Sequence, residues 1–481
     1  MQRLYALGAL SFMVVGCDSL TSSPAGSGTV GVDAGSSSEV NGTAIPAEPQ
    51  RAGDPSRGYS ALVNEGIVAC GIPWTIYSRF FGAAPEGDRL PGRTRKNANL
   101  PFGQTAFTTS AGVEVVSANC LTCHAGHING QLIVGLGNTE QDYTTDPSSN
   151  ARTARGIASQ LTSDPKEIAE LQKWASRVEA VGPYSVLDTV GPNPGDNFAA
   201  VLLSHRDPAT LAWSDTPLLD LPPKIGVPLD VPPWWRMKKK NSMFYVDAGR
   251  GDHARIEMAA ANLCTDTVEE AKKIDAWFPD VRAYLASIEP PKWPYSIDGD
   301  LAQRGRGVFE ATCSRCHGTY GEGGRYPNVF LSLDDVGTDP VLAIGGSQFA
   351  DRFIDWWKKS FYGEMSRLEP KKGYVAPPLD GIWATAPYLH NGSVPTIAQL
   401  LDSKTRPKFW TRTFISTDYD AEAIGWTHTA LDHGKADEPD GTVRKKLYDT
   451  TQLGYANGGH TFGDQFSDSD RRAVLEYLKT L

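Results

Sequence analysis

The sequence predicts a mainly α-helical protein of two domains with long irregular loops. Residues 164–181 and 301–312 combine apolar residues at helical spacing with typical helix-start residues. A third, short amphipathic stretch closes the chain at residues 473–481. Between residues 192 and 233, prolines are dense and apolar periodicity is weak, so long ordered loops are expected there. With 481 residues, the chain is long enough for two or three domains.

The N-terminus resembles an export signal. Arg3 is followed by an apolar run at residues 4–15, which is too short to span a bilayer. Residues 14–17 (VVGC) resemble the lipobox of bacterial lipoproteins, in which the cysteine becomes lipidated. We therefore predict a lipoprotein signal peptide at residues 1–16 and a lipid on Cys17. This places the protein in the periplasm or cell envelope, held to a membrane by its lipid anchor only; the alternative is an ordinary cleaved signal and a secreted protein.

Residues 17–55 are rich in Ser, Gly, Thr and Ala and have few large apolar side chains. Such a segment buries too little apolar surface to offset chain entropy, so a flexible tether is expected. The formal net charge of −10 gives no general reason to expect a nucleic-acid partner, because binding phosphates requires a basic surface.

Two copies of one pattern, CxxCH, carry the chemistry. They are Cys120, Cys123 and His124 in the first copy, and Cys313, Cys316 and His317 in the second. Cysteines three residues apart lie on one side of a helical turn, which suits two thioether bonds to the vinyl groups of a haem, and the next histidine can then bind the iron. The pattern therefore predicts two covalently bound haem c groups. Zinc is the main rival, and the export signal argues against it.

Further helices are expected between the two motifs. In the helix at 164–181, Asp164 is the cap, Pro165 takes the first position and Glu167 completes a capping box. Its buried stripe is Ile168, Leu171, Ala175, Val178 and Val181. A helix is expected at residues 267–278 and another at residues 279–288. Residues 290–294 (PPKWP) form a stiff linker.

The region around the second motif resembles a class I cytochrome c domain. Gly305 and Phe309 share one face of the helix at 301–312, and Ser467 with Asp470 forms a capping box before the last helix. A notch of small residues lets two helices cross closely, as the N- and C-terminal helices do in class I cytochromes c. We therefore expect a C-terminal cytochrome c domain at residues 298–481. Residues 56–297 would form an N-terminal haem domain with loop insertions.

Only Cys70 and Cys264 then remain without a role. Two leftover cysteines in an oxidising compartment are expected to pair, so a disulfide between them is predicted. Two separately buried thiols are the alternative.

Together with the two motifs, residues 379–401 (LDGIWATAPYLHNGSVPTIAQLL) indicate a family. The sequence from residue 58 to residue 481 resembles the di-haem bacterial cytochrome c peroxidase superfamily, and most closely its rubber oxygenase branch. In that superfamily the second haem has a distal ligand late in the chain, a methionine in the peroxidases and a histidine in the rubber oxygenase branch. Here the interval after residue 401 contains His428, His433 and His460 and no methionine before the last helix. His460 fits the family position best, which implies a second haem bound by His317 and His460.

For the first haem, His124 is the expected proximal ligand, and the resemblance implies an open or weakly bound distal position. His127 faces the same side as His124. His205 and His253 have no supporting motif, although either could be the distal ligand. His390 is expected to hold a loop or meet a haem propionate.

Other side chains have a structural reading beside a functional one. The run at residues 238–240 (KKK) is expected to be a solvated face, with docking of an acidic partner or balance of propionates as alternatives. Trp234, Trp235 and Trp293 are expected to pack in the core or linker, with electron relay between haems as the alternative.

The leading hypothesis is a di-haem oxidoreductase, peroxidase-like or oxygenase-like. One haem would transfer electrons and the other would react with peroxide or dioxygen. Its partners would be a redox partner protein or a small-molecule oxidant. Calcium is left open as a further cofactor. The rival hypothesis is a non-enzymatic periplasmic electron carrier.

Overall fold

The computed structural model describes residues 42–348 and 350–481, so the predicted signal peptide, Cys17 and most of the tether lie outside the described residues. The α-helices are α2 (Pro55–Asn64), α3 (Trp74–Phe80), α4 (Leu121–His124), α5 (Ser148–Gly156), α6 (Ala158–Leu161), α7 (Pro165–Val181), α8 (Gly195–Ser204), α9 (His253–Glu257), α10 (Val268–Asp275), α11 (Phe278–Ser287), α12 (Gly299–Thr312), α13 (Ser314–His317), α14 (Leu333–Val336), α15 (Val341–Gln348), α16 (Ala350–Lys359), α17 (Ile397–Leu400), α18 (Gly441–Arg444) and α19 (Asp468–Leu478). Short 3₁₀ segments connect many of them, among them η1 (Glu86–Asp88), η4 (Trp234–Lys239) and η5 (Met258–Leu263).

The strands are short and form several small antiparallel sheets instead of one large one. Three sheets have three strands each: β2 (Ile72–Pro73), β4 (Glu114–Ala118) and β3 (Gln104–Thr108); β1 (Thr43–Ala44), β8 (Val329–Ser332) and β10 (Gly373–Val375); and β14 (His428–Leu431), β11 (Phe409–Arg412) and β15 (Tyr448–Asp449). Three pairs complete the set: β5 (Ala125–Ile128) with β6 (Gln131–Val134), β7 (Gly249–Gly251) with β9 (Ser366–Leu368), and β12 (Tyr419–Asp420) with β13 (Gly425–Trp426).

The prediction of a mainly α-helical protein built from two class I cytochrome c-like domains is wrong. The chain is about 40% helical and 13% strand, with its strands spread over the small sheets. The physical reason lies in the 48 glycines and 33 prolines, which interrupt helices and leave long connections whose backbone groups must pair elsewhere. Strands of two to five residues are too short to show readable apolar alternation.

The sequence predicts where helices begin better than it predicts the sheets. The Asp164 side chain accepts a hydrogen bond from the Lys166 N–H, and Pro165 occupies the first turn of α7 as predicted. Glu167, however, bonds the Thr75 and Thr162 hydroxyls, so it does not close the expected capping box. The region predicted as loops, residues 192–233, also contains the helix α8, whose apolar run is only partly buried.

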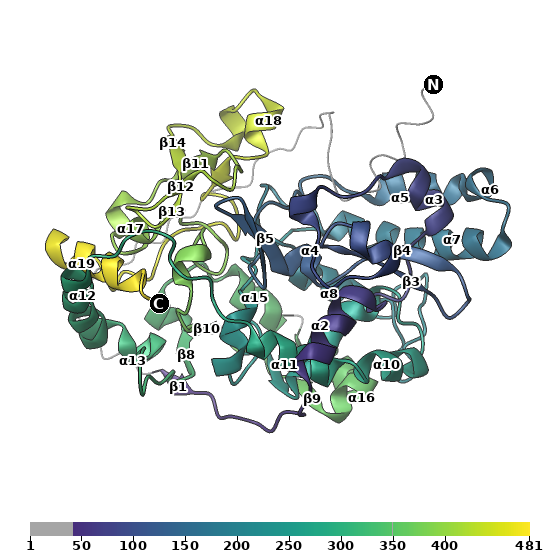
Figure 1. Cartoon of the computed structure of the whole chain (residues 1–481), viewed down its shortest axis with the longest axis horizontal. Helices are drawn as coiled ribbons and strands as arrows, with labels where there is room; N and C mark the ends of the chain where they lie inside the picture. Colours follow the sequence, from purple (N-terminus) through teal and green to yellow (C-terminus); the bar gives the residue numbers. More distant parts are fainter. Residues whose placement is uncertain (1–41, 349) are drawn as a thin grey trace.

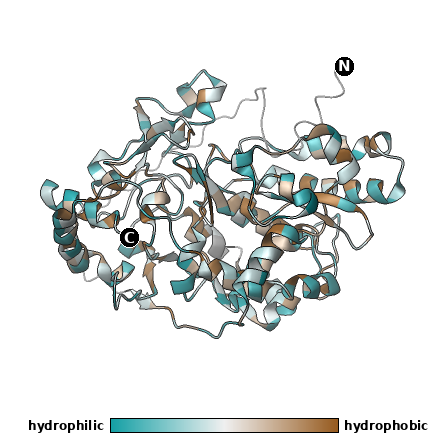
Figure 2. Cartoon of the chain, in the orientation of Figure 1, coloured by the Kyte–Doolittle hydropathy of each residue, from teal (hydrophilic) through white to brown (hydrophobic). Residues whose placement is uncertain are grey.

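The helices α12 and α19 cross at one end of the molecule, and α5, α6 and α7 lie at the opposite end (Figure 1). The Ser467 side chain caps α19 by accepting the Asp470 N–H. Hydrophilic residues are prominent on these outer helices (Figure 2). Clusters of buried apolar side chains fill the interior, and one of them joins Phe309 of α12 and Val474 of α19 to Trp235 and Ile128 from the first half of the chain.

Residues 43–54 do not form a free tether. The strand β1 pairs with β8, and the Arg51 guanidinium bonds the carboxylates of Asp252 and Asp275. Composition alone could not show this, because these residues attach by polar contacts and backbone pairing and bury little apolar surface. Within the described part of the chain, no helix combines the length and apolar character needed to cross a membrane.

Candidate functional site

The first CxxCH motif forms one short turn between two small sheets. The strand β4 leads into Cys120, and the His124 N–H bonds the Cys120 carbonyl at 3.1 Å, which closes the turn. Cys120 and Cys123 are free thiols. Burial raises the pKa of Cys120 to about 12 and also raises the pKa of Cys123. Both sulfurs are therefore neutral thiols, and that of Cys123 also accepts a hydrogen bond from the Asn193 side-chain amide at 3.3 Å.

His124 is packed against the indole of Trp234. The ring centroids lie 4.7 Å apart at an angle of 19°. The Trp234 N–H bonds the Gly135 carbonyl at the end of the β5–β6 hairpin, so the hairpin fixes Trp234 beside the motif. Burial lowers the pKa of His124 to about 4, opposed in part by the Pro232 carbonyl, and its Nδ1 has no well-formed hydrogen bond. The imidazole is thus neutral, as a metal ligand must be.

The second motif follows directly from α12. The His317 N–H bonds the Cys313 carbonyl at 3.0 Å, and the Nδ1 of His317 lies 2.8 Å from the Pro377 carbonyl. A carbonyl accepts only, so the Nδ1 carries the proton and the Nε2 keeps its lone pair. Burial lowers the pKa of His317 and holds it neutral. Cys313 and Cys316 are also free thiols, and burial raises the pKa of both.

His460 faces His317 from the far end of the chain. Their ring centroids lie 6.1 Å apart. Arg406 holds the His460 loop by donating to the carbonyls of Asn457 and Gly459 at 2.7 Å each, and to that of His460 at 3.1 Å. Burial lowers the pKa of His460 to about 3, and its Nδ1 is buried without a partner.

This spacing suits one metal ion between the two rings. An imidazole nitrogen binds a metal at about 2.0–2.1 Å. Two such bonds, together with the distance from nitrogen to ring centre in each imidazole, separate the two ring centroids by roughly 6 Å. The His317 and His460 ring centroids stand at this separation. The donor set and the spacing therefore fit a haem iron, which His317 and His460 would hold together.

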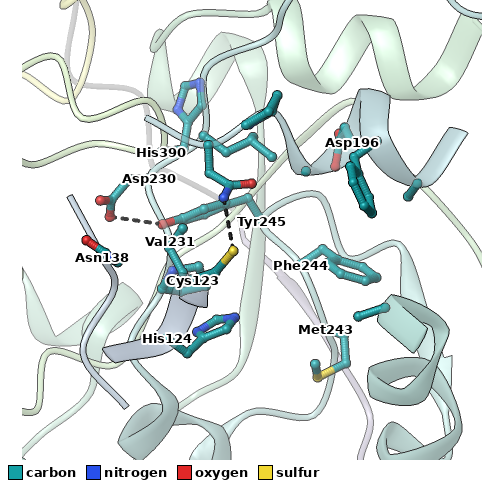
Figure 3. Close-up of a pocket in the computed structure, with 18 of the residues that line it drawn as sticks. Cys123, His124, Asn138, Asp196, Asp230, Val231, Met243, Phe244, Tyr245 and His390 are labelled. Atoms are coloured by element: carbon teal, nitrogen blue, oxygen red, sulfur yellow. Dashed lines mark hydrogen bonds between the residues drawn. The ribbon is translucent and has the colours of Figure 1, made fainter. Parts of the chain in front are cut away.

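One large cavity connects the two motifs. Its volume is about 1450 Å³, and its lining includes His124, His317, His460 and the four motif cysteines. Apolar residues dominate the rest of the lining, which suits the mostly apolar face of a porphyrin. Figure 3 shows His124 and Cys123 in this pocket together with Met243, Phe244 and Asp196.

The remaining histidines have other partners. His205 stacks on Trp213, and neither His205 nor His253 lines the cavity, so neither is placed to bind the first iron. His127 lies 3.2 Å from Asp88 and 3.6 Å from Glu140. His428 bonds Gln399, and His433 contacts Asp432 and Glu438.

His390 also lines the cavity, and its surroundings are aromatic. Its ring stacks on Tyr374 with centroids 4.2 Å apart, and its Nε2 lies 3.1 Å from the Tyr374 hydroxyl. The neighbouring Tyr245 hydroxyl bonds the buried Asp230 carboxyl at 3.3 Å (Figure 3). His390 therefore holds a polar network inside the cavity wall.

Three cavity residues were not singled out from the sequence. Asp196 has its pKa raised to about 6 by burial, and Glu257, whose two oxygens are buried without partners, has its pKa raised to about 8 by burial. The ring of Phe244 is 47% exposed, because it projects into the cavity from a backbone with a φ of 68°. Single acidic or aromatic residues outside a motif give no sequence signal of this kind.

Cys70 and Cys264 form a disulfide in the structure, and both residues are fully buried. The bond joins the start of the β2 region to the end of η5. In the described part of the chain, no group of three or more His, Cys, Asp or Glu side chains is arranged to hold a metal ion, and so no such group presents itself for calcium.

Comparison with known proteins relates one segment to haem cytochromes. Residues 373–411 match a family described as RoxA-like, cytochrome c-like. This segment contains Pro377, whose carbonyl fixes His317, and His390. The match supports a relationship to RoxA-like haem cytochromes, and the wider di-haem peroxidase assignment stays a prediction.

Two curated relatives come from Sinorhizobium fredii (strain NBRC 101917 / NGR234). The uncharacterized protein y4iM is 29% identical over 330 residues, which are 60% of this chain and 72% of the relative. The uncharacterized protein y4iJ is 28% identical over 290 residues, which are 46% of each chain. Neither name states an activity.

Proposed function

We propose that this protein is an exported c-type cytochrome with two covalent haem c groups and acts as an oxidoreductase. One haem would be attached at Cys120 and Cys123, with His124 as its ligand. The other would be attached at Cys313 and Cys316, between His317 and His460. The RoxA-like segment supports the haem cytochrome part of this proposal. The number of haems, the reaction and the export rest on the motifs, the cavity and the N-terminal sequence.

The observation that carries the proposal is the difference between the two motif histidines. His317 has a second histidine across a gap that suits one metal ion, whereas among the ring contacts of the described residues His124 has Trp234 stacked on its face and no second histidine. Two axial imidazoles give a six-coordinate iron suited to electron transfer, and an iron with one strong axial ligand can bind a small oxidant. The two sites would therefore divide electron transfer and oxidant binding between them.

The haems, once bound, supply the electron transfer and the oxidant-binding position; the chain sets their surroundings. The Pro377 carbonyl orients the His317 ring, and Arg406 keeps His460 opposite to it. Around His124, the cavity wall is largely apolar, and Phe244 occupies space in that pocket. Asp196 and Glu257 are acids in the same cavity that can hold a proton near neutral pH.

The partners and the location belong to the same proposal. A lipid on Cys17 would hold the protein in the periplasm or cell envelope, and a redox partner protein or a small-molecule oxidant would exchange electrons with it. The mildly acidic composition, with a net charge of −10, supports a basic redox partner over an acidic one.

The test is the spectrum of the full chain matured in a host that attaches haem. Two haems per chain are expected to remain bound after denaturation. The oxidised or half-reduced protein should contain a high-spin component that cyanide, peroxide or dioxygen shifts. A chain with two haems that stays low-spin and unresponsive in every redox state would instead be an electron carrier. A colourless protein would overturn the proposal altogether.

A further inference from the structure

The 3₁₀ helix η4 lies between the two motifs and carries an unusual row of charges. Its first residue, Trp234, packs on His124, and its third, Arg236, is close enough to His317 to lower the pKa of that histidine. Lys238, Lys239 and Lys240 follow at its end. The segment therefore contacts the first motif through Trp234 and places the Arg236 cation near the second.

The three lysines differ in their partners. The Lys238 ammonium lies 2.6 Å from the Glu289 carboxylate, and the Lys239 ammonium lies 2.7 Å and 2.8 Å from the two oxygens of Asp380. Among the described residues, the Lys240 ammonium has neither an ion pair nor a hydrogen bond, and Lys240 lines the cavity. Two of the lysines are thus neutralised by carboxylates of the chain, and the third is not.

Arg236 is similarly short of a counter-ion. It is only 7% exposed, it lines the cavity, and it donates to the Asp380 carbonyl at 3.2 Å and the Thr385 hydroxyl at 3.3 Å. These acceptors are neutral. Within the described residues its guanidinium has no carboxylate within ion-pair distance, and the nearby Asp230 carboxyl has its pKa raised strongly by burial, which favours its neutral form.

Arg236 is buried and Lys240 is half-buried, and taking a cation out of water without a counter-ion is costly, because pairing does not offset the desolvation. The carboxylate that interacts electrostatically with Lys240 is that of Asp247, and it already forms ion pairs with Lys371 and Arg250. Glu257 lies in the same cavity, but burial raises its pKa to about 8, so it is mostly protonated at neutral pH. A negatively charged ligand in the cavity would offset this cost.

We propose that Lys240 and Arg236 form a carboxylate-binding site that receives the propionates of the haem held by His317 and His460. The inference rests on the proposed function, which supplies the haem. A haem carries carboxylates on one edge of an otherwise apolar ring, and this cavity offers apolar walls with two unpaired cations at one place. Guanidinium and ammonium groups are the usual partners of such carboxylates.

The site has a consequence for the reduction potential. A carboxylate paired with a cation contributes little net charge at the iron, whereas an unpaired carboxylate stabilises the oxidised, more positive iron. Loss of the paired cation also raises the pKa of the carboxylate, because the charged form is no longer stabilised. Removal of Lys240 should therefore lower the potential and make it depend on pH near neutrality.

The experiment compares Lys240→Met with Lys238→Met in the haem-loaded full chain, by spectroelectrochemical titration at several pH values. Lys240→Met should lower the reduction equilibrium constant of the second haem about tenfold, which corresponds to 59 mV for one electron. Its potential should also fall as the pH rises. Lys238→Met removes the same formal charge from the surface and should match the wild type. Lys240→Arg should restore the wild-type potential, because it keeps the cation.

Haem content, measured on denatured protein, separates this inference from the proposed function. A wild type without covalent haem would end the proposed function itself. Two haems per chain with identical potentials in Lys240→Met and Lys238→Met would overturn only the propionate site. If adding acetate shifts the wild-type potential, Lys240 binds diffusible carboxylates instead of a propionate, and this result also overturns the propionate site. If Lys240→Met does not accumulate, Lys240→Gln provides the same measurement.

Discussion

The backbone carbonyl of Ala473 lies directly against Gly305, where a side chain of any size would overlap with it. This contact marks the point at which α12 and α19 cross, next to the second motif. Because α12 runs straight into Cys313, the crossing helps to position the thiol pair and His317.

Substitution of Gly305 by Ala should therefore destabilise the protein. Overpacking at a tight helix crossing costs about 1–3 kcal/mol, and here the obstacle is backbone that cannot rotate away. Gly307 is the matched control: it lies in the same helix, and a Cβ there would meet nothing within 4 Å. Gly307→Ala should stabilise the helix by about 0.5–1 kcal/mol. Chemical denaturation measures both, and equal effects would contradict the close crossing.

The Gly305 crossing could be predicted from the sequence because it depends on local patterns. Ser467, Asp470 and the small residue at position 305 lie within short windows whose spacing indicates a helix. The same holds for the two CxxCH turns. The inference that such a crossing makes the whole protein a pair of helical domains failed, because β1, β8 and β10 join residues 43–44, 329–332 and 373–375, and such distant pairings leave no periodic signal.

The candidate site also contains some features that the sequence predicts and others that only the structure shows. The facing of His460 and His317 was inferred from a family resemblance and the absence of methionine, not from any spacing between them. The run at residues 238–240 predicts a solvated face, with docking of an acidic partner or balance of propionates as alternatives, and only the tertiary partners of Lys238 and Lys239 distinguish Lys240 from them. Phe244, Asp196 and Glu257 are brought into the cavity by the tertiary course of the backbone, which composition does not record.

The Cys70–Cys264 disulfide should contribute strongly to stability. It closes a loop with a sequence separation of 194 residues, and a cross-link over a long loop restricts the unfolded chain most. Replacing both cysteines by Ala should lower the free energy of unfolding by about 2–5 kcal/mol. Because both residues are fully buried, a mild reductant should not reduce the disulfide while the wild type is folded. The reductant should lower the measured stability only by reducing the bond in chains that have unfolded. Equal stability of the double variant and the wild type would contradict this prediction.

A buried ion pair should make the protein sensitive to acid. Burial raises the pKa of Asp266, but Arg206, Lys173 and Arg177 outweigh it, so the pKa is lowered overall. A carboxyl with a lowered folded pKa stabilises the protein above its unfolded pKa, and this contribution is lost as the pH falls through the folded pKa. Arg206 is fully buried, so Asp266→Asn leaves its charge unpaired and should cost about 3–5 kcal/mol at neutral pH.

The control for Asp266 is Asp432→Asn, because the Asp432 side chain is 99% exposed. It should change stability by less than about 0.5 kcal/mol. The difference in stability between the wild type and Asp266→Asn should shrink as the pH falls below about 4, where the carboxyl of the unfolded chain becomes protonated, and should be lost once the pH is below the lowered pKa of the folded state. A difference that stays constant from neutral to acidic pH would show that the pair does not titrate in this way.

Removal of His460 should convert the second haem site from a closed to an open one. His460 is the ring that faces His317 across the 6.1 Å gap, so His460→Ala should leave one axial position free. The low-spin signal of the second haem should be replaced by a high-spin one that added cyanide or imidazole reverses. His428→Ala is the matched control, because His428 comes from the same interval of the chain, bonds Gln399 and does not line the cavity. The spectrum of His428→Ala should equal that of the wild type. If His428→Ala loses the low-spin signal of the second haem and His460→Ala keeps it, then His428 is the ligand and the assignment of His460 is wrong.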